Sequence, residues 1–181
     1  CVDRRREAAI KHLAFGVSAV TFLVSLGLYG NFRLDVPGMQ FSEQAPWIAW
    51  LRAEYHVGVD GISLLLVLLT TFLTAVAILS SYAAVTTAVK EYMVCVLLLE
   101  TGMLGVFLSL DLLLFFVFWE VGLVPMYFLI ARWGSANRNY ASLKFMLFTI
   151  GGSLGLLLAT QALGLTFGSF DLPVLFQKVP A

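Results

Sequence analysis

The sequence contains little charge for its length. Only 12% of its 181 residues are Asp, Glu, Lys or Arg, whereas an ordinary soluble domain has about 25%. Basic and acidic residues balance at eleven each, so the chain lacks the positive excess typical of nucleic-acid-binding proteins. Hydrophobic residues make up 60% of the chain, and the mean hydropathy is +0.92. This composition excludes an ordinary soluble domain and predicts an integral membrane protein.

The sequence also lacks the residue clusters that bind metals or nucleotides. Its two cysteines, Cys1 and Cys95, lie far apart, and neither belongs to a Cys-x-x-Cys motif or a Cys/His cluster. No glycine-rich phosphate loop follows a strand-like segment. We therefore expect no iron–sulfur, zinc, haem or nucleotide site in this chain.

Five apolar segments are long enough to cross a bilayer as helices, which takes about 20 residues each. We expect an all-α integral membrane fold in which they form a single membrane region over residues 1–181. Residues 31–60 are expected to be an outer loop. Within it, the aromatic-rich stretch 46–55 is expected to be a helix, either at the lipid headgroups or packed on the protein. The expected spans are residues 12–30, 61–82, 92–110, 112–131 and 140–163.

Polar residues mark the connections between these spans. Asp60 is expected to cap the N-terminus of the second span. Residues 83–91 are expected to be a linker that ends in Lys90 and Glu91, and Asp111 to mark a tight turn. Residues 164–181 are expected to be a loop or the beginning of a further segment.

The distribution of Lys and Arg predicts the orientation of the chain. If the N-terminus is inside, seven of these residues lie in inside segments and three in outside segments. Because inside loops carry the excess of Lys and Arg, we expect a cytoplasmic N-terminus and an outer C-terminus. The inside residues are Arg4, Arg5, Arg6, Lys11, Lys90, Arg132 and Arg138, and the outside ones are Arg33, Arg52 and Lys178.

The fourth span, LLLFFVFWEVGLVPMYFLIA, carries the carboxylate Glu120 near its middle and Pro125 five residues later. A charged group at the centre of a span costs about 2.5–3.5 kcal/mol on insertion scales, and proton handling is a common reason to keep one. Pro125 cannot donate to the carbonyl of Val121, which leaves an acceptor beside the acid that can hold water. We interpret Glu120 as a proton carrier and Pro125 as a distortion of its helix. A simple kink is the alternative for the proline.

Glu100 lies at a similar depth in the third span. The third and fourth spans are joined by almost no loop and should be antiparallel neighbours, so Glu100 and Glu120 could face one another or share a hydrated cavity. Two close carboxylates do not both ionise readily, so one of them is expected to hold a proton. The alternative for Glu100 is a structural carboxylate hydrogen-bonded to Thr101 or Ser109.

Lys144 is the third ionisable residue inside a span, about four residues from the beginning of the fifth. One interpretation is that its long side chain reaches back to the membrane interface. The other is a charge partner of Glu120, acting through water and setting its proton affinity.

Two stretches of the sequence resemble a known family. LLLFFVFWEVGLVPMYFLIARWG, followed by YASLKFMLFTIGGS, closely resembles the antiporter-like subunits M (chain 4) of proton-pumping NADH:quinone oxidoreductase, respiratory complex I. The earlier YHVGVDGISLLLVLLTTFL is also similar to these subunits, so the resemblance covers most of residues 55–165.

The resemblance implies a larger bundle than this chain supplies. Members of the family have about fourteen transmembrane helices in two inverted repeats, with a proton path of a glutamate and lysines near mid-membrane. Glu120 matches the family's essential glutamate, and Lys144 lies where several members have lysine. Glu100 matches no shared acidic position. We expect the chain to be part of a longer subunit, whose next, broken helix carries the lysine that usually pairs with the glutamate.

The resemblance further implies a proton-translocating subunit of NADH:quinone oxidoreductase, an EC 7.1.1 type translocase, in a bacterial inner membrane. The chain would have no redox site of its own. NADH, FMN, iron–sulfur clusters and quinone would be handled by partner subunits of the membrane-bound complex. The alternatives are a subunit of a multi-subunit cation/proton antiporter, a subunit of a membrane hydrogenase, and a membrane scaffold that translocates nothing.

Overall fold

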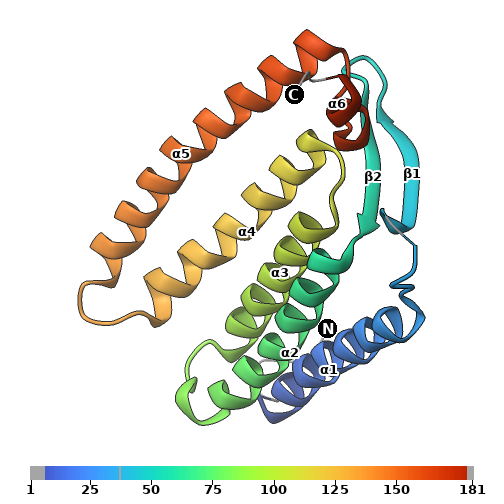
Figure 1. The fold of residues 1–181 in the computed structure, drawn as a ribbon. Coiled ribbons are helices and arrows are strands. Elements are labelled where there is room, and N and C mark those ends of the chain that lie inside the picture. The colour runs from blue at the N-terminus through green and yellow to red at the C-terminus, as the bar shows by residue number, and fades with distance from the viewer. Residues whose placement is uncertain (1–6, 37, 179–181) are drawn as a thin grey trace.

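The computed structural model describes residues 7–36 and 38–178, and within them it contains six helices and one two-stranded hairpin (Figure 1). Helices α1 to α5 are long and apolar enough to cross a membrane, which confirms the predicted helical membrane architecture. The elements are α1 (Glu7–Asn31), β1 (Gln40–Ile48), β2 (Ala53–Val59), α2 (Gly61–Ala84), α3 (Val89–Leu108), α4 (Leu112–Trp133), α5 (Arg138–Phe167) and α6 (Leu172–Lys178).

Several helices extend beyond the spans expected from hydropathy. Lys90 and Glu91, which we expected in a linker, lie in the first turn of α3. Arg132 lies in the last turn of α4, and Arg138 is the first residue of α5. The first or last helical turn thus carries charged side chains, so hydropathy does not reveal that these residues are helical.

The loop expected at residues 31–60 contains a β-hairpin, and the expectation of a helix over residues 46–55 is wrong. β1 and β2 pair antiparallel around a turn at residues 49–52. Pro46 lies beside a shift in the register, where a strand tolerates a residue without an N–H group. β2 is fixed by a distant part of the chain, because the His56 carbonyl accepts a hydrogen bond from Leu110 N at 2.8 Å. A local sequence pattern does not reveal this pairing.

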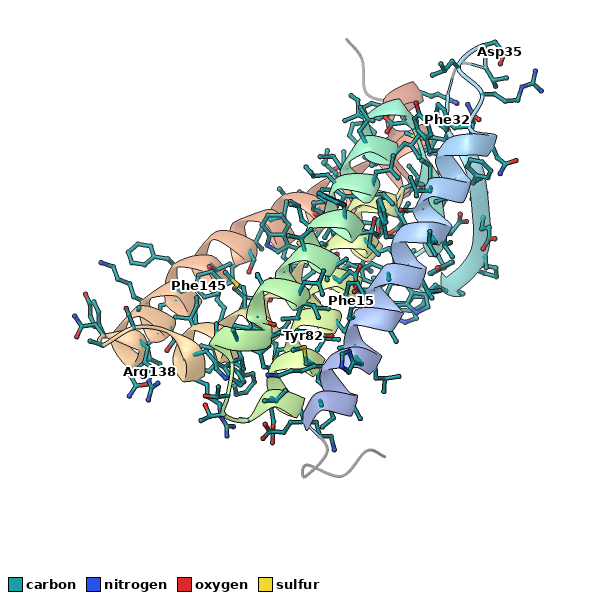
Figure 2. The ribbon with its side chains drawn as sticks, turned by 90° about the horizontal axis from the view of Figure 1, so that it is seen from below. Phe15, Phe32, Asp35, Tyr82, Arg138 and Phe145 are labelled. Atoms are coloured by element: carbon teal, nitrogen blue, oxygen red, sulfur yellow. The ribbon has the colours of Figure 1, made fainter. Side chains whose placement is uncertain are left out.

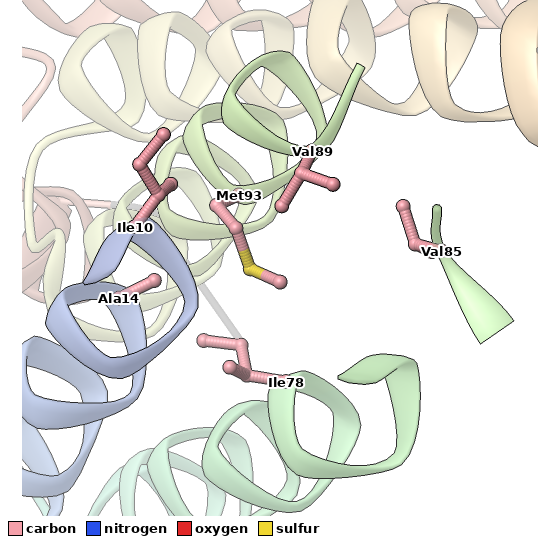
Figure 3. Close-up of a cluster of buried hydrophobic side chains, with 6 residues drawn as sticks. All are labelled: Ile10, Ala14, Ile78, Val85, Val89 and Met93. Carbon is pink, nitrogen blue, oxygen red and sulfur yellow. The ribbon is translucent and has the colours of Figure 1, made fainter. Parts of the chain in front are cut away.

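Helices α1, α2 and α3 pack around a small apolar core near the end of the bundle where α1 begins. Figure 3 shows the buried side chains that meet there, and Phe15 and Tyr82, labelled in Figure 2, pack against them. Lys11 Nζ donates to the carbonyl oxygens of Tyr82 at 2.7 Å and Val85 at 3.0 Å. This places a cation at the C-terminus of α2, where the helix dipole favours it. The core residues are Ile10, Ala14, Ile78, Val85, Val89 and Met93.

Buried hydroxyl groups line the contact between α1 and α2. Ser25 Oγ and Thr71 Oγ1 lie 2.9 Å apart across the two helices, and Thr71 Oγ1 also donates to the carbonyl of Val67 at 3.0 Å. Small hydroxyl residues let membrane helices approach closely and hydrogen-bond to one another. The two helices therefore meet along a polar but satisfied seam.

Helices α3, α4 and α5 follow one another as antiparallel neighbours, with the hairpin and α6 near the start of α4 and the end of α5 (Figure 1). Within residues 164–181, which we expected to be a loop or the beginning of a further segment, α5 continues to Phe167 and the short helix α6 follows. Phe170, between these helices, is only 1% exposed. Its ring occupies the space that a Cβ atom at Gly164 would need. The glycine therefore admits the ring that closes this end of α5.

Candidate functional site

Glu120 lies inside membrane helix α4 and is half-buried. Its Oε1 atom is buried and has no hydrogen-bond partner among the residues that the structure describes. Most buried polar atoms in proteins have such a partner, and each exception calls for an explanation. An ionisable residue inside a membrane helix is by default a candidate for a functional site.

Pro125 lies inside the same helix and is fully buried. A proline has no N–H group, so the carbonyl of Val121, four residues earlier, loses its helical partner. This carbonyl belongs to the residue that directly follows Glu120. The helix therefore offers a free backbone acceptor next to the carboxyl group.

Glu100 on α3 is more deeply buried, with 4% exposed, and its Oε1 atom also has no partner within the described residues. The structural alternative with Thr101 or Ser109 as partner is wrong. Thr101 Oγ1 donates to the carbonyl of Leu97 at 2.9 Å, and Ser109 Oγ donates to that of Gly105 at 2.6 Å. Both hydroxyls bond within their own helix, which leaves Glu100 as a second unpaired acid.

The two glutamates do not meet across the contact between α3 and α4. This contact is centred on two glycines, because a Cβ atom at Gly102 would lie 3.0 Å from the backbone of Gly122. Glu100 and Glu120 each precede one of these glycines by two residues, which is about 200° of rotation in an α-helix. Each glutamate therefore lies on nearly the opposite side of its helix from the contact. The expected face-to-face arrangement is absent.

The side of α3 that carries Glu100 faces α1 and α2. Met93 lies two helical turns before Glu100 on the same face, and it packs in the core formed with Ile10 and Ile78. Glu120 lies on the side of α4 away from α3. The two acids thus have separate surroundings, about four residues or roughly 6 Å apart along the antiparallel helices.

Lys144 is exposed on α5 and makes no ion pair with Glu120. Its Nζ atom lies 5.7 Å from the ring centroid of Tyr140 and 5.9 Å from that of Phe148, within the range of cation–π attraction. Ser142, two residues earlier, is buried, so Lys144 projects from a different side of the helix. The structure therefore does not pair Lys144 with Glu120.

A second group of buried ionisable residues lies outside the membrane helices, where the hairpin meets the ends of α4 and α6. His56 Nδ1 lies 2.6 Å from Asp171 Oδ1, and His56 Nε2 lies 2.9 Å from Ser42 Oγ. We call the buried residues His56, Asp111 and Asp171, together with the exposed Ser42, the hairpin clasp. Ser42 and His56 belong to the hairpin, and Asp171 directly precedes α6. The contact between His56 and Asp171 therefore joins segments 115 residues apart in the chain.

Asp111 is the member of the hairpin clasp that caps α4. It is completely buried, and its Oδ1 atom accepts from the backbone N–H groups of Leu113 at 2.9 Å and Leu114 at 3.0 Å. Its Oδ2 atom accepts from Glu54 N in β2 at 3.1 Å. One carboxylate therefore caps the helix that carries Glu120 and anchors the hairpin to it.

The hairpin clasp was missed by sequence analysis, which placed His56 in a loop and read Asp111 as the mark of a turn. One signal was available, since Asp60, Asp111 and Asp171 each directly precede a helix, as N-cap residues do. Nothing local in the sequence connects His56 with Asp171. Within the described residues, no group of three or more His, Cys, Asp and Glu side chains could hold a metal ion.

Comparison with known proteins shows the family to which this arrangement belongs. Residues 109–180 match the family described as NADH:quinone oxidoreductase/Mrp antiporter, TM. The chain is 48% identical over 167 residues to NADH-quinone oxidoreductase subunit M of Rhodobacter capsulatus, covering 92% of this chain and 32% of that protein. It is 44% identical over 168 residues to the subunit of the same name from Rickettsia conorii, covering 93% and 34%.

The fold is also similar to a solved structure, that of respiratory complex I from Thermus thermophilus with bound NADH. The match has a TM-score of 0.82 and 29% identity, and it covers 94% of this chain and 35% of that one. The chain thus spans about a third of the length of the curated relatives it matches. Residues 109–180 thus belong to the transmembrane family shared by NADH:quinone oxidoreductases and Mrp antiporters, and over nine-tenths of the chain is similar to the subunits M named above.

Proposed function

We propose that this chain is part of a proton-translocating membrane subunit of an NADH:quinone oxidoreductase, and that Glu120 carries the proton. The observation that supports this most directly is the buried, unpartnered Oε1 atom of Glu120 in the middle of α4. A carboxyl group in this state gains or loses a proton with few other contacts to break. The carbonyl of Val121, freed by Pro125, supplies an acceptor for a water molecule or a proton beside it.

Neighbouring charge sets the proton affinity of Glu120 in this proposal. A cation close to a carboxyl group favours its ionised form, so an approaching lysine promotes proton release and a retreating one promotes uptake. Lys144 lies in membrane helix α5, and its position on the exposed side of that helix leaves its side chain free to move. Glu100 is the second acid available to pass a proton on.

The electron-transfer chemistry belongs to partner subunits in this proposal. NADH, FMN, iron–sulfur clusters and quinone react there, the subunit has no redox site of its own, and the assembly is a translocase of the EC 7.1.1 type. The subunit lies in a bacterial inner membrane among the other membrane-arm subunits. The start of α1 faces the cytoplasm, which is supported by the seven Lys and Arg residues predicted for that side, against three on the other.

The proposal is tested by replacing Glu120 with Gln in the full-length subunit of the assembled complex. Reconstituted vesicles would be supplied with NADH and quinone, and proton movement followed with a pH-sensitive dye. We expect Glu120→Gln to lower proton movement at least about tenfold, since general acid–base groups contribute factors of this size or more. Assembly, measured by native gel electrophoresis, should be unchanged.

Two further variants make the test specific. Glu120→Asp keeps a titratable group and should retain much of the proton movement. Glu91→Gln removes a carboxylate from the first turn of α3, away from the proposed path, and should have no effect on proton movement. Undiminished proton movement in Glu120→Gln would show that the carboxyl group carries no proton and favour a purely structural subunit.

A further inference from the structure

We propose that an anionic phospholipid binds at the end of the bundle where α3 begins and α4 ends. Its phosphate would lie between Lys90 and Arg132, and an acyl chain would follow a groove between the two helices. This groove has a volume of about 450 Å³, and we call it the basic groove. It is lined by Lys90, Glu91, Val94, Cys95, Phe128, Arg132 and Trp133.

The basic groove changes from charged to apolar along the helix axis. Lys90 on α3 and Arg132 on α4 lie at its rim, at the ends of their helices. Val94 and Phe128 lie four residues further along the same two helices, about 6 Å towards the membrane interior. A phospholipid has the same order of groups along its length, with a charged phosphate at the surface and hydrocarbon directly below it.

The basic residues of the rim are available to an anion. Lys90 and Arg132 are both exposed, and neither side chain forms a hydrogen bond or an ion pair with another residue that the structure describes. The Arg132 guanidinium lies 5.6 Å from the ring centroid of Trp133, and tryptophan is typical of the membrane–water interface. Glu91 shares the rim, and Glu7 lines a smaller hollow beside it.

The charge of the whole end of the bundle outweighs these two acids. Among the described residues, this end has four basic residues and two acidic ones, whereas the hairpin end has three basic and six acidic ones. The basic end thus complements an anionic lipid surface, to which each Lys or Arg adds attraction. A protein helix packed into the basic groove would instead have to supply acids for Lys90 and Arg132, or leave two cations buried without partners.

The inference is tested in the assembled complex containing the full-length subunit. The complex would be reconstituted in vesicles of phosphatidylcholine with a fifth of phosphatidylglycerol, and a phosphatidylglycerol probe with a photoreactive group in its acyl chain would be cross-linked by light. Peptides from α3 and α4 would be mapped by mass spectrometry. We expect labelling at Val94, Cys95 or Phe128, at least about fivefold above that by a phosphatidylcholine probe with the same photoreactive group.

A pair of variants then tests the role of the charges. Lys90→Gln with Arg132→Gln should lower phosphatidylglycerol labelling in the basic groove at least about fivefold. Arg33→Gln with Arg52→Gln removes two cations from the outer loop and should leave it unchanged. Equal labelling by the two probes in the unaltered complex would overturn the inference, because the groove would then accept lipid without reading its headgroup. Absence of labelling by either probe would also overturn it, since another protein segment would then fill the groove.

Discussion

The hairpin clasp and the membrane helices bury carboxyl groups in opposite ways. Asp111 and Asp171 lie outside the spans, and their carboxylates accept hydrogen bonds from backbone N–H groups or contact a histidine. Glu100 and Glu120 lie inside the spans, and each has a buried oxygen without a partner among the described residues. Burial alone therefore does not distinguish a hydrogen-bonded acid from an acid without partners in this protein.

The presence of partners separates the two kinds of acid. A carboxylate with satisfied hydrogen bonds holds its neighbours in place, and the folded protein loses stability when this carboxylate changes its charge. A carboxyl group without partners contributes little to folding, and its proton can change with little loss of contacts. This difference predicts that variants in the two regions will affect different measurements.

The largest effect on folding is expected from Asp111→Ala. The change removes the acceptor for three backbone N–H groups, two in the first turn of α4 and one in β2. Loss of a helix cap together with buried unsatisfied donors should lower the free energy of unfolding by about 2–3 kcal/mol. Steric trapping of the full-length subunit in bicelles would measure it. A loss below half of this range would mean that water replaces the carboxylate and that the contrast with the glutamates is weak.

The pair of His56 and Asp171 should show the next largest effect. His56→Gln and Asp171→Asn are each expected to lower the free energy of unfolding by about 1–2 kcal/mol, because the 2.6 Å contact between them is buried. The double variant should lose less than the sum of the single ones, since both remove the same contact. Additive losses in this cycle would show that the two residues act independently.

A smaller effect is expected at Asp60, which caps α2 with its side chain and forms a capping box with Ser63. The N–H group of Ser63 donates to the carboxylate at 2.7 Å and lowers the pKa of Asp60 below its usual value of 3.8. Because this pKa is lower in the folded state, the stabilisation is complete above the unfolded pKa of about 3.9 and is lost as the pH falls through the folded value.

Asp60→Ala should therefore lower the free energy of unfolding by about 1 kcal/mol at pH 7. The difference from the unaltered protein should shrink below about pH 4, as the cap loses its charge there. Asp35→Asn is the matched control, because Asp35 is exposed and pairs with Arg33, and surface pairs contribute little. A pH-independent loss at Asp60 would assign its effect to packing.

The smallest effect on folding is expected from Glu120→Gln. The carboxyl group has a buried oxygen without a partner, so replacing it by a neutral amide of the same shape should change the free energy of unfolding by less than about 0.5 kcal/mol. The same measurement should show this while proton movement falls. A loss comparable to that in Asp111→Ala would place Glu120 among the structural acids and remove the distinction between the two regions.

The membrane helices could be predicted because hydrophobic composition acts locally. Each span appears as an apolar run of about twenty residues, and Asp60 was recognised as a cap from its position alone, which the structure confirms. The ends were less certain, since Lys90 and Arg132 continue their helices into polar surroundings. Here backbone hydrogen bonding, not side-chain hydropathy, decides where the helix stops.

The hairpin and the relation between the glutamates depend on distant contacts. β2 is held by Leu110 and Asp111, about fifty residues away in the chain, and neither can be recognised as a partner from the sequence of β2. The separate sides of Glu100 and Glu120 follow from the contact between Gly102 and Gly122. The two-residue spacing of glutamate and glycine is visible in both helices, but only the structure shows that these glycines touch.

Helix α4 is held by contacts at both of its ends and lacks one backbone hydrogen bond between them. Asp111 binds the first turn of α4 to the hairpin, and at the other end of the helix the indole nitrogen of Trp133 donates to the Thr87 carbonyl at 3.0 Å. Pro125 removes one helical hydrogen bond between these ends, at the carbonyl of the residue next to Glu120. A displacement of either end of α4 would bend the helix at this carbonyl, because the backbone hydrogen bond is missing there. The bend would therefore lie beside Glu120.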